Sequence, residues 1–419
     1  MKRIALAAML GLMALAPVQA QTVVKYLNIA SIPEEVALMK SLADEYMAMH
    51  PDVKIELPFL ENEAFKAKLT TLLQSNEAPD IFHSWGGGVF YEQAKSGVLR
   101  DVTNVVSQEA KDEIGTAGVA AFTAPDGKLY GLARDVSEVV LWYNKTLFAK
   151  AGVDPASLKD WNGFLAAVQK FKDAGITPLA LGAKDKWPAH FWWSKLVVRL
   201  AGQDGFNAAA AGEGDGFAGP DFVKAGEYFL QLASLDPWQE GFQAATYGDA
   251  SGYFGDGKAA MHLMGDWDYG AMKDNSASKA GIPDDELGIL PFPTIEGGKG
   301  DPTDTLGGIG GYLFSKNASD EAVKFLEWYN ARAQQEKFAV SGKFYIPLAK
   351  GAADVMTNPF KVQVAKDIGG AHWHANFFDQ ALGPAVGGVV NDVSAELAAN
   401  ALSAADAAQQ VKDAVDEGQ

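Results

Sequence analysis

The sequence predicts an α/β fold made of two regions, each with a sheet covered by helices. Strand-like and helix-like segments alternate from residue 23 to residue 82, and repeated βα units form parallel sheets with helices on both faces. A second α/β region starts near Gly131. The chain has 419 residues, 48% hydrophobic and 21% charged. It is therefore long enough for two or three domains with substantial cores.

The first region is expected to run strand, helix, strand, helix, strand. Ser31 and Glu34 form a capping-box pattern before a helix whose apolar residues recur every three or four positions. His50 and Pro51 end it, and an alternating apolar pattern follows. The expected elements are a strand at 23–29, a helix ending at 49, a strand at 53–57, a helix at 65–73 and a strand beginning at 81.

The second region is predicted from the same periodicities. Val139–Tyr143 is a strong strand candidate because it is short, apolar and bounded by polar residues. Helices are expected at 161–174, 221–235 and 321–335, and from 391 to near the end. The Gly- and Asp-rich stretches at 202–220 and 296–311 are expected to be loops or connections.

Residues 1–20 have the layout of a signal peptide. Lys2 and Arg3 precede a 13-residue apolar run from Ile4 to Ala16, and Val18-Gln19-Ala20 places small residues before a cleavage site. The run is too short for a membrane span, which needs ~20 residues. We expect cleavage after Ala20 and an exported mature protein that does not insert into a membrane. The absence of cysteine points to a bacterial periplasm and to stability without disulfides.

Composition excludes several functions. The formal charge of −18 makes nucleic acid and anionic membranes poor partners. Lys258 follows glycines as in a phosphate-binding loop, but Ala259 replaces the hydroxyl residue that would hold magnesium. His372 and His374 lack a third ligand at a recognised spacing. We expect no metal, cofactor or catalytic residue.

A glycoside hydrolase that uses a pair of acidic residues stays an open alternative, because a sequence does not show the distances between its many Asp and Glu side chains.

Tryptophan-rich segments are the most informative feature, with 10 Trp in the chain. Trp142 and Trp192 lie inside apolar runs that are typical of a core. Four others neighbour Gly, Asp, His or Asn in expected loops: Trp85, Trp187, Trp267 and Trp373. Three glycines follow Trp85 and indicate a close backbone approach.

Aromatic and polar residues in such a mixture suit a sugar. A pyranose has an apolar C–H face, which an aromatic plane covers, and a rim of hydroxyl groups. Asp, Asn, His and Lys side chains satisfy that rim, and charge-assisted hydrogen bonds are the stronger ones. The residues therefore favour a neutral polyol over a phosphate or a lipid.

The order of several short motifs resembles the family 1 extracellular solute-binding proteins of ABC sugar importers, the maltose-binding-protein type. The resemblance covers nearly all of the chain after residue 20. The matching stretches are 78–82 with Trp85, 96–99, 127–132, 141–145, 257–261, 265–267, 290–293 and 321–326.

The resemblance implies a two-lobed periplasmic binding protein of type II, with hinge crossings and a central cleft. The N-terminal lobe would comprise 21–132 plus 303–345, and the C-terminal lobe 133–302 plus 346–419. The crossings would fall near 132–137, 291–303 and 344–350. Trp85 matches the aromatic residue that the first lobe places in the cleft, and Trp267 matches the main stacking residue of the second. Phe378 and Asp379 match a C-terminal contact segment, and Asp135 lies in the first crossing.

The sequence and the resemblance together predict a periplasmic, monomeric, non-enzymatic protein that delivers a neutral sugar to the membrane permease of an ABC importer. The Ser-Trp-Gly-Gly-Gly and Asn-Phe-Phe-Asp segments resemble members that take up α-galactosides and other short oligosaccharides. An exported glycoside hydrolase and a binder of a cation such as a polyamine are the alternatives. The expected ligand-binding residues are Trp85, Asp135, Trp187, His190, Trp267, Asp268, Trp373, Phe378 and Asp379.

Overall fold

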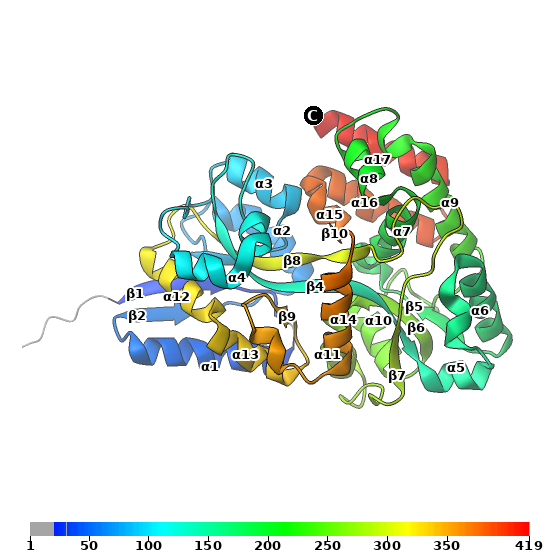
Figure 1. Ribbon diagram of the computed structural model, residues 1–419, viewed down its shortest axis with the longest axis horizontal. Coiled ribbons are helices and arrows are strands. Elements are labelled where there is room, and N and C mark those ends of the chain that lie inside the picture. Colours follow the sequence, from blue (N-terminus) through cyan, green and yellow to red (C-terminus); the bar gives the residue numbers. More distant parts are fainter. Residues whose placement is uncertain (1–20, 31, 419) are drawn as a thin grey trace, which may run out of the picture.

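The structure is a computed structural model that describes residues 21–30 and 32–418 (Figure 1). The predicted signal peptide, residues 1–20, lies outside the described residues, as does Ser31 of the predicted capping box. Within the described residues, no helix is both long and apolar enough to cross a membrane.

One mixed sheet runs through the described part of the molecule in the order β2-β1-β3-β8-β4-β6-β5, with β10 on β8 and with β7 and β9 on β4. The strands β1 to β3 are parallel, whereas β8 is antiparallel to both β3 and β4. The strands are β1 Thr22–Leu27, β2 Val53–Glu56, β3 Ile81–Ser84, β4 Gly131–Asn144, β5 Thr177–Ala180, β6 Ala259–Gly265, β7 Leu287–Leu290, β8 Thr305–Phe314, β9 Ile346–Pro347 and β10 His374–Asn376.

Helices cover the sheet on both sides; Figure 1 shows α1 and α13 below its first half and α3 and α4 above it. In the first half the helices are α1 Pro33–Met49, α2 Asn62–Leu73, α3 Gly87–Lys95, α4 Gln108–Ala121, α12 Asp320–Asn330 and α13 Arg332–Ser341. The remaining α-helices are α5 Lys145–Ala151, α6 Trp161–Asp173, α7 Trp187–Leu200, α8 Gly202–Ala210, α9 Pro220–Ala233, α10 Tyr247–Gly255, α11 Asp268–Asn275, α14 Pro359–Gly370, α15 Phe378–Ala381, α16 Gly383–Ala398 and α17 Ala404–Gly418. Four short 3₁₀ helices in the described residues are η1 Pro155–Lys159, η2 Ala183–Asp185, η3 Gly216–Ala218 and η4 Ala352–Val355.

The buried apolar residues fall into two clusters, which we call the first and the second core. The first core takes its members from residues 24–133 and 312–345. The second takes them from residues 139–306 and 346–415. Each core therefore combines chain segments that are far apart in sequence. The predicted two-lobed α/β architecture is present, and the exact lobe boundaries stay a prediction.

Three strands join the two halves. β4 and β8 run side by side from the pair Gly131–Leu313 to the pair Glu138–Gly307, and β9 adds to β4 at Asp135 and Val136. The register shifts between Ala133 and Asp135, which is the mark of a β-bulge and bends a strand locally. The crossings expected at 132–137 and 344–350 thus correspond to β4 and to the segment that contains β9.

The middle crossing was predicted in the wrong place. Phe292 and Ile295 belong to the second core, and the crossing is β8 rather than residues 291–303. The expected loop at 296–311 is also wrong in its last part, because β8 begins at Thr305 and its glycines resemble a loop in a sequence. In the structure a Cβ at Gly307 would lie 1.8 Å from the Ser137 carbonyl oxygen, and one at Gly311 would lie 2.3 Å from the Leu132 carbonyl oxygen. Glycine here allows a close backbone approach within a sheet.

Two other predictions need correction. The expected loop at 202–220 contains α8 and η3, because Phe206 and Phe217 are buried in the second core and fix that segment. The expected helix at 321–335 is two helices, α12 and α13, with extended backbone at Ala331 between them. The helices predicted at 161–174 and 221–235 are confirmed as α6 and α9.

Candidate ligand-binding site between the lobes

Aromatic side chains from both halves gather where the two cores meet. We call Trp85, Trp187, Phe191, Trp267 and Phe377 the interlobe aromatic cluster. The ring of Phe191 lies 5.5 Å from that of Trp187, 6.3 Å from that of Trp267 and 5.8 Å from that of Phe377. Trp267 and Phe377 lie 5.9 Å apart. The cluster brings together three of the tryptophans that the sequence predicts for the site.

Trp85 is the contribution of the first half. It directly follows β3, is partly buried and packs against both cores. Its ring lies edge-on to His83 at 4.6 Å and to Phe65 at 6.0 Å. Across the interface, Asn376 Nδ2 donates a hydrogen bond of 3.4 Å to the Trp85 carbonyl. Trp85 is therefore anchored on one lobe and faces the other.

The position of Trp267 depends on Gly265, the last residue of β6. A Cβ at Gly265 would lie 2.1 Å from the Trp267 ring, so the indole rests directly on the backbone at the end of that strand. The side chain stays partly buried. An aromatic face held by rigid backbone and left partly open is suited to stack against a ligand.

Lys66 of α2 reaches from the first half toward the second. Its ammonium nitrogen lies 5.5 Å from the centre of the Trp85 ring and 6.0 Å from that of Trp187. It lies 3.4 Å from a carboxylate oxygen of Glu63 and 3.9 Å from one of Asp379. Its side chain is 29% exposed. A cation therefore sits between one indole of each half.

Polar groups of the second half adjoin this cation. Nδ1 of His190 lies 2.7 Å from the Trp187 carbonyl oxygen, and Nε2 lies 3.8 Å from Asp379 Oδ1. Asn391 Nδ2 donates to Asp379 Oδ2 at 3.4 Å. Burial lowers the pKa of His190, so the ring is neutral near pH 7. Burial acts to raise the pKa of Asp379, but His190, Lys66 and two amides outweigh it and hold that pKa below its ordinary value.

Three of the expected site residues lie elsewhere in the second half, in or beside its core. Asp268 is fully buried, and its carboxylate binds the Tyr247 hydroxyl at 3.0 Å, the Ser251 hydroxyl, and His262 Nδ1 at 3.0 Å. Phe378 is also fully buried, with its ring 4.3 Å from that of Phe206. Trp373 packs on the same Phe206 ring at 5.6 Å. The structure does not bring these three into the interlobe aromatic cluster.

Asp135 lies in the crossing strand β4 and is 7% exposed. Its carboxylate accepts a hydrogen bond of 2.7 Å from Arg134 Nε. Arg134 also donates to the Tyr312 hydroxyl at 2.6 Å and stacks 4.0 Å from the Tyr345 ring. In this conformation Asp135 neutralises a buried arginine beside the bulge.

The glycines after Trp85 make a close backbone contact, as the sequence predicts, with α15 and α16. A Cβ at Gly87 would lie 2.7 Å from the Gln380 carbonyl oxygen, and one at Gly88 would lie 2.6 Å from the Gly383 nitrogen. Gly87 also has φ of +69°, a conformation that glycine adopts without strain. These glycines therefore let α3 of the first half meet α15 and α16.

Sequence reasoning missed Lys66, Phe191, Phe377 and Asn391. Lys66 lies within a helix pattern that carries two lysines, Lys66 and Lys68, and no local signal distinguishes them. Phe191 and Phe377 adjoin residues that were chosen, and α7 is buried along its whole length. The runs His190-Phe191 and Asn376-Phe377 were the available signal for these two phenylalanines.

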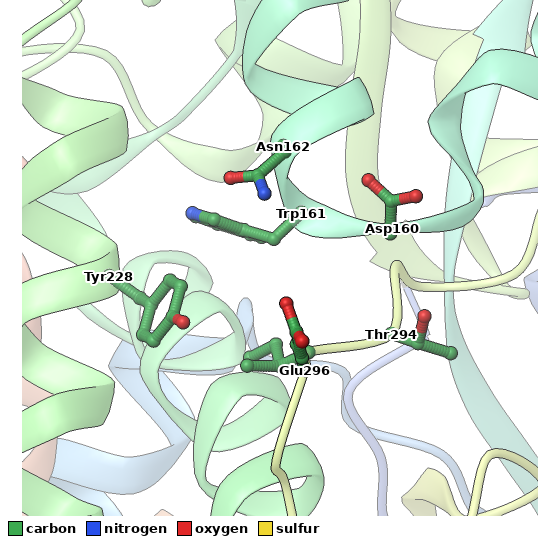
Figure 2. Close-up of a pocket in the computed structure, with 7 residues that line it drawn as sticks. Asp160, Trp161, Asn162, Tyr228, Thr294 and Glu296 are labelled. Carbon is green, nitrogen blue, oxygen red and sulfur yellow. The ribbon is translucent and has the colours of Figure 1, made fainter.

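A separate surface pocket lies on the second half (Figure 2). Its volume is about 290 Å³, and it lies beside the start of α6, one face of α9 and the segment after β7. The lining residues are Asp160, Trp161, Asn162, Tyr228, Thr294, Ile295 and Glu296. None of the expected site residues lines it. Within the described residues, no group of three or more His, Cys, Asp or Glu side chains could hold a metal ion.

Residues 30–336 match the model of the bacterial extracellular solute-binding protein family. The chain belongs to this family. Among curated relatives, an uncharacterized ABC transporter extracellular-binding protein of Pyrococcus horikoshii is 28% identical over 257 residues, 60% of this chain and 56% of that protein. The maltotriose-binding protein of Pyrococcus abyssi is 24% identical over 336 residues, 78% of this chain and 66% of that protein. The chain thus spans less than two thirds of the length of these two relatives.

Solved structures share the fold over nearly the whole chain. A structure from work on xylan utilization by Caldanaerobius polysaccharolyticus has a TM-score of 0.86 and 26% identity, and the match covers 93% of this chain and 99% of that one. A chitin oligosaccharide binding protein has a TM-score of 0.82 and 25% identity, covering 95% and 98%. The predicted two-lobed binding-protein fold is confirmed.

Proposed function

We propose that this protein is the exported solute-binding component of an ABC importer, and that it binds a neutral sugar between its lobes and delivers it to the permease. The interlobe aromatic cluster carries the proposal. Trp85 from one half and Trp187 and Trp267 from the other supply stacking faces, and Lys66, His190 and Asp379 supply polar groups beside them. Aromatic faces with adjacent donors and acceptors match a sugar ring and its hydroxyl groups.

Closure of the lobes would complete such a site. The rings come from both halves, so a ligand that contacts Trp85 and Trp267 together favours the closed arrangement by its differential contacts.

Cleavage after Ala20, a periplasmic location and a monomeric state belong to the same proposal. So does the preference for a short oligosaccharide such as an α-galactoside, which the segments Ser84–Gly88 and Asn376–Asp379 support.

The two alternatives make different demands on the site. A polyamine would bring positive charge to a place where Lys66 already lies between Trp85 and Trp187, and like charges repel. A glycoside hydrolase would use two carboxyl groups on either side of the bond it cleaves. The names of the relatives, which include a maltotriose-binding and a multiple sugar-binding protein, support binding rather than cleavage.

A ligand screen tests the proposal. The purified mature chain is heated with raffinose, maltotriose, xylotriose, chitotriose or spermidine, and each sugar mixture is assayed for released monosaccharide. A sugar at 100 times its Kd should add ~2.7 kcal/mol to the free energy of unfolding and raise the Tm by a few degrees. A shift with spermidine alone would contradict the proposal, as would release of monosaccharide.

A further inference from the structure

The start of α3 meets α15 and the start of α16 in a contact made of backbone atoms. Figure 1 shows these helices beside one another where the two halves meet. A Cβ at Gly88 would lie 2.6 Å from the Gly383 nitrogen and 2.7 Å from the Ala381 carbonyl oxygen. Non-bonded carbon atoms pack at about 3.5–4.0 Å, so a side chain does not fit there. We call Gly87, Gly88, Gln380, Ala381 and Gly383 the glycine seam.

Nothing in its own half requires glycine at position 88. Gly88 lies in the first turn of α3 and has a negative φ, and alanine stabilises such a helix relative to glycine. The three nearest atoms that a Cβ would meet belong to Ala381 and Gly383, both in the second half. Only the presence of the second half therefore excludes a side chain at this position.

The hydrogen bond beside the seam also joins the two halves. Asn376 Nδ2 donates to the Trp85 carbonyl at 3.4 Å, and the same nitrogen would lie 2.8 Å from a Cβ at Gly87. The glycine contact and this hydrogen bond therefore form in the same approach of the halves. Rotation of one half about β4 and β8 would separate both contacts and move Trp85 away from Trp267. The seam thus belongs to an arrangement in which the halves have closed on this side.

The seam bears on affinity because a ligand that contacts Trp85 and Trp267 together binds tightly only to the closed arrangement. Its apparent Kd rises in proportion as the closed fraction falls. We propose that the glycine seam sets this fraction: the halves close because position 88 carries no side chain, and Gly88 thereby determines ligand affinity without touching the ligand. Gly88 is a positioning residue that acts through Trp85. For its ligand, the inference rests on the proposed function.

Two variants attack the seam by different chemistry. Gly88→Ala adds one methyl group. Asn376→Asp adds no bulk but places an acceptor against the Trp85 carbonyl. Gly388→Ala is the matched control, because Gly388 is an exposed residue of α16 and a Cβ there would meet nothing within 4 Å. Surface plasmon resonance with a sugar identified by the thermal screen should give a Kd at least ~10-fold weaker in both seam variants, through faster dissociation, and a Kd within twofold of the wild type in the control.

A distance measurement tests closure directly. The chain has no cysteine, so spin labels on Lys95→Cys of α3 and Ala385→Cys of α16, both at exposed positions, report only the separation of these helices. Pulsed electron paramagnetic resonance of the otherwise unchanged chain should show a short-distance population that grows with saturating sugar. Adding Gly88→Ala should remove that population. The Tm of unliganded Gly88→Ala should equal or exceed that of the wild type, because alanine favours the helix.

Each contrary result identifies its own cause. A lower unliganded Tm in Gly88→Ala than in Gly388→Ala would mean that α3 and α16 pack permanently, and the inference would be wrong. Equal distance distributions with and without Gly88→Ala would also overturn it, as would a Kd of Gly88→Ala within twofold of the wild type. If no sugar binds the wild type but Gly88→Ala still removes the short-distance population, the proposed function fails and the role of the seam in closure stands.

Discussion

Asp268 and Asp379 differ in environment although their sequence contexts are alike. Both lie beside an aromatic residue in a polar segment, and both are buried, with exposed fractions of 0% and 7%. The Asp268 carboxylate accepts from two hydroxyl groups and pairs with His262. Around Asp379, by contrast, the contacts are long, and His190 Nε2 and Asn391 Oδ1 have no partner among the described residues; beside Asp268 only His262 Nε2 lacks one.

We infer from this difference that Asp268 has a structural role, whereas Asp379 keeps capacity for a ligand. A buried charge that the protein satisfies in full stabilises one conformation and has no capacity left for a ligand. A buried charge with open capacity beside it costs stability until a ligand or water completes its hydrogen bonds. Neither property is visible in a sequence, because both depend on side chains from other elements.

The prediction with the largest expected effect on stability concerns the removal of the Asp268 carboxylate. The variant Asp268→Ala leaves the Tyr247 hydroxyl, the Ser251 hydroxyl and His262 without their common acceptor, and it should lower the free energy of unfolding by ~3–5 kcal/mol. Urea denaturation measures the loss. Asp379→Ala should lose less than half as much. Equal losses would mean that the two carboxylates have the same structural role.

The second test extends the comparison to tryptophans. Trp267→Ala should weaken binding of a sugar identified by the thermal screen by ~2–4 kcal/mol, the range of an exposed anchor residue, and leave the fold intact. Trp142→Ala is the matched core change, since Trp142 is fully buried, and it should cost ~3–5 kcal/mol of stability. Calorimetry and melting curves of both variants distinguish these outcomes. A collapse of the unliganded Tm in Trp267→Ala would show that this indole is a core residue.

The prediction with the smallest expected effect concerns His374, a histidine with only one of its two ring nitrogens hydrogen-bonded. Its Nδ1 contacts the Thr305 hydroxyl at 2.8 Å, while its Nε2 has no partner in the described structure. Burial, and then Lys195, lower its pKa from 6.5 to about 4. Between these values the unfolded chain binds the proton and the folded chain does not, so this histidine makes stability rise with pH.

The variant His374→Gln should remove that dependence. The wild type should lose ~1–2 kcal/mol more than the variant when the pH falls from 6.5 to 4.5, an order-of-magnitude figure from the pKa difference. Glu138, whose pKa burial raises to about 7, acts in the opposite direction in both proteins and cancels in the difference. Parallel pH slopes for the two proteins would show that the folded chain protonates His374 as easily as the unfolded one.

Local pattern was enough to predict much of the fold. Periodicity placed α6 and α9, and the alternation of strand and helix revealed the parallel start of the sheet. It failed at β8, where glycines that permit close strand packing resemble a loop. Part of the candidate site could be proposed from the sequence too, since Trp85, Trp187 and Trp267 stand beside polar or glycine residues. Lys66 could not, because only the contact between the two halves brings it beside Trp187. Asn391 could not, because only the packing of α16 against α15 brings it to Asp379.

The position of β8 has a consequence for how the chain is made. It lies between β3 and β4 in the sheet, yet about 220 residues separate its start from the end of β3. At a synthesis rate of ~5–20 residues per second, the ribosome needs ~10–40 s to supply it. Until then the first core lacks Tyr312, Leu313 and Phe314 and its sheet has an open edge. The first half of a nascent chain therefore cannot complete its sheet and its core until the residues of β8 have been synthesised.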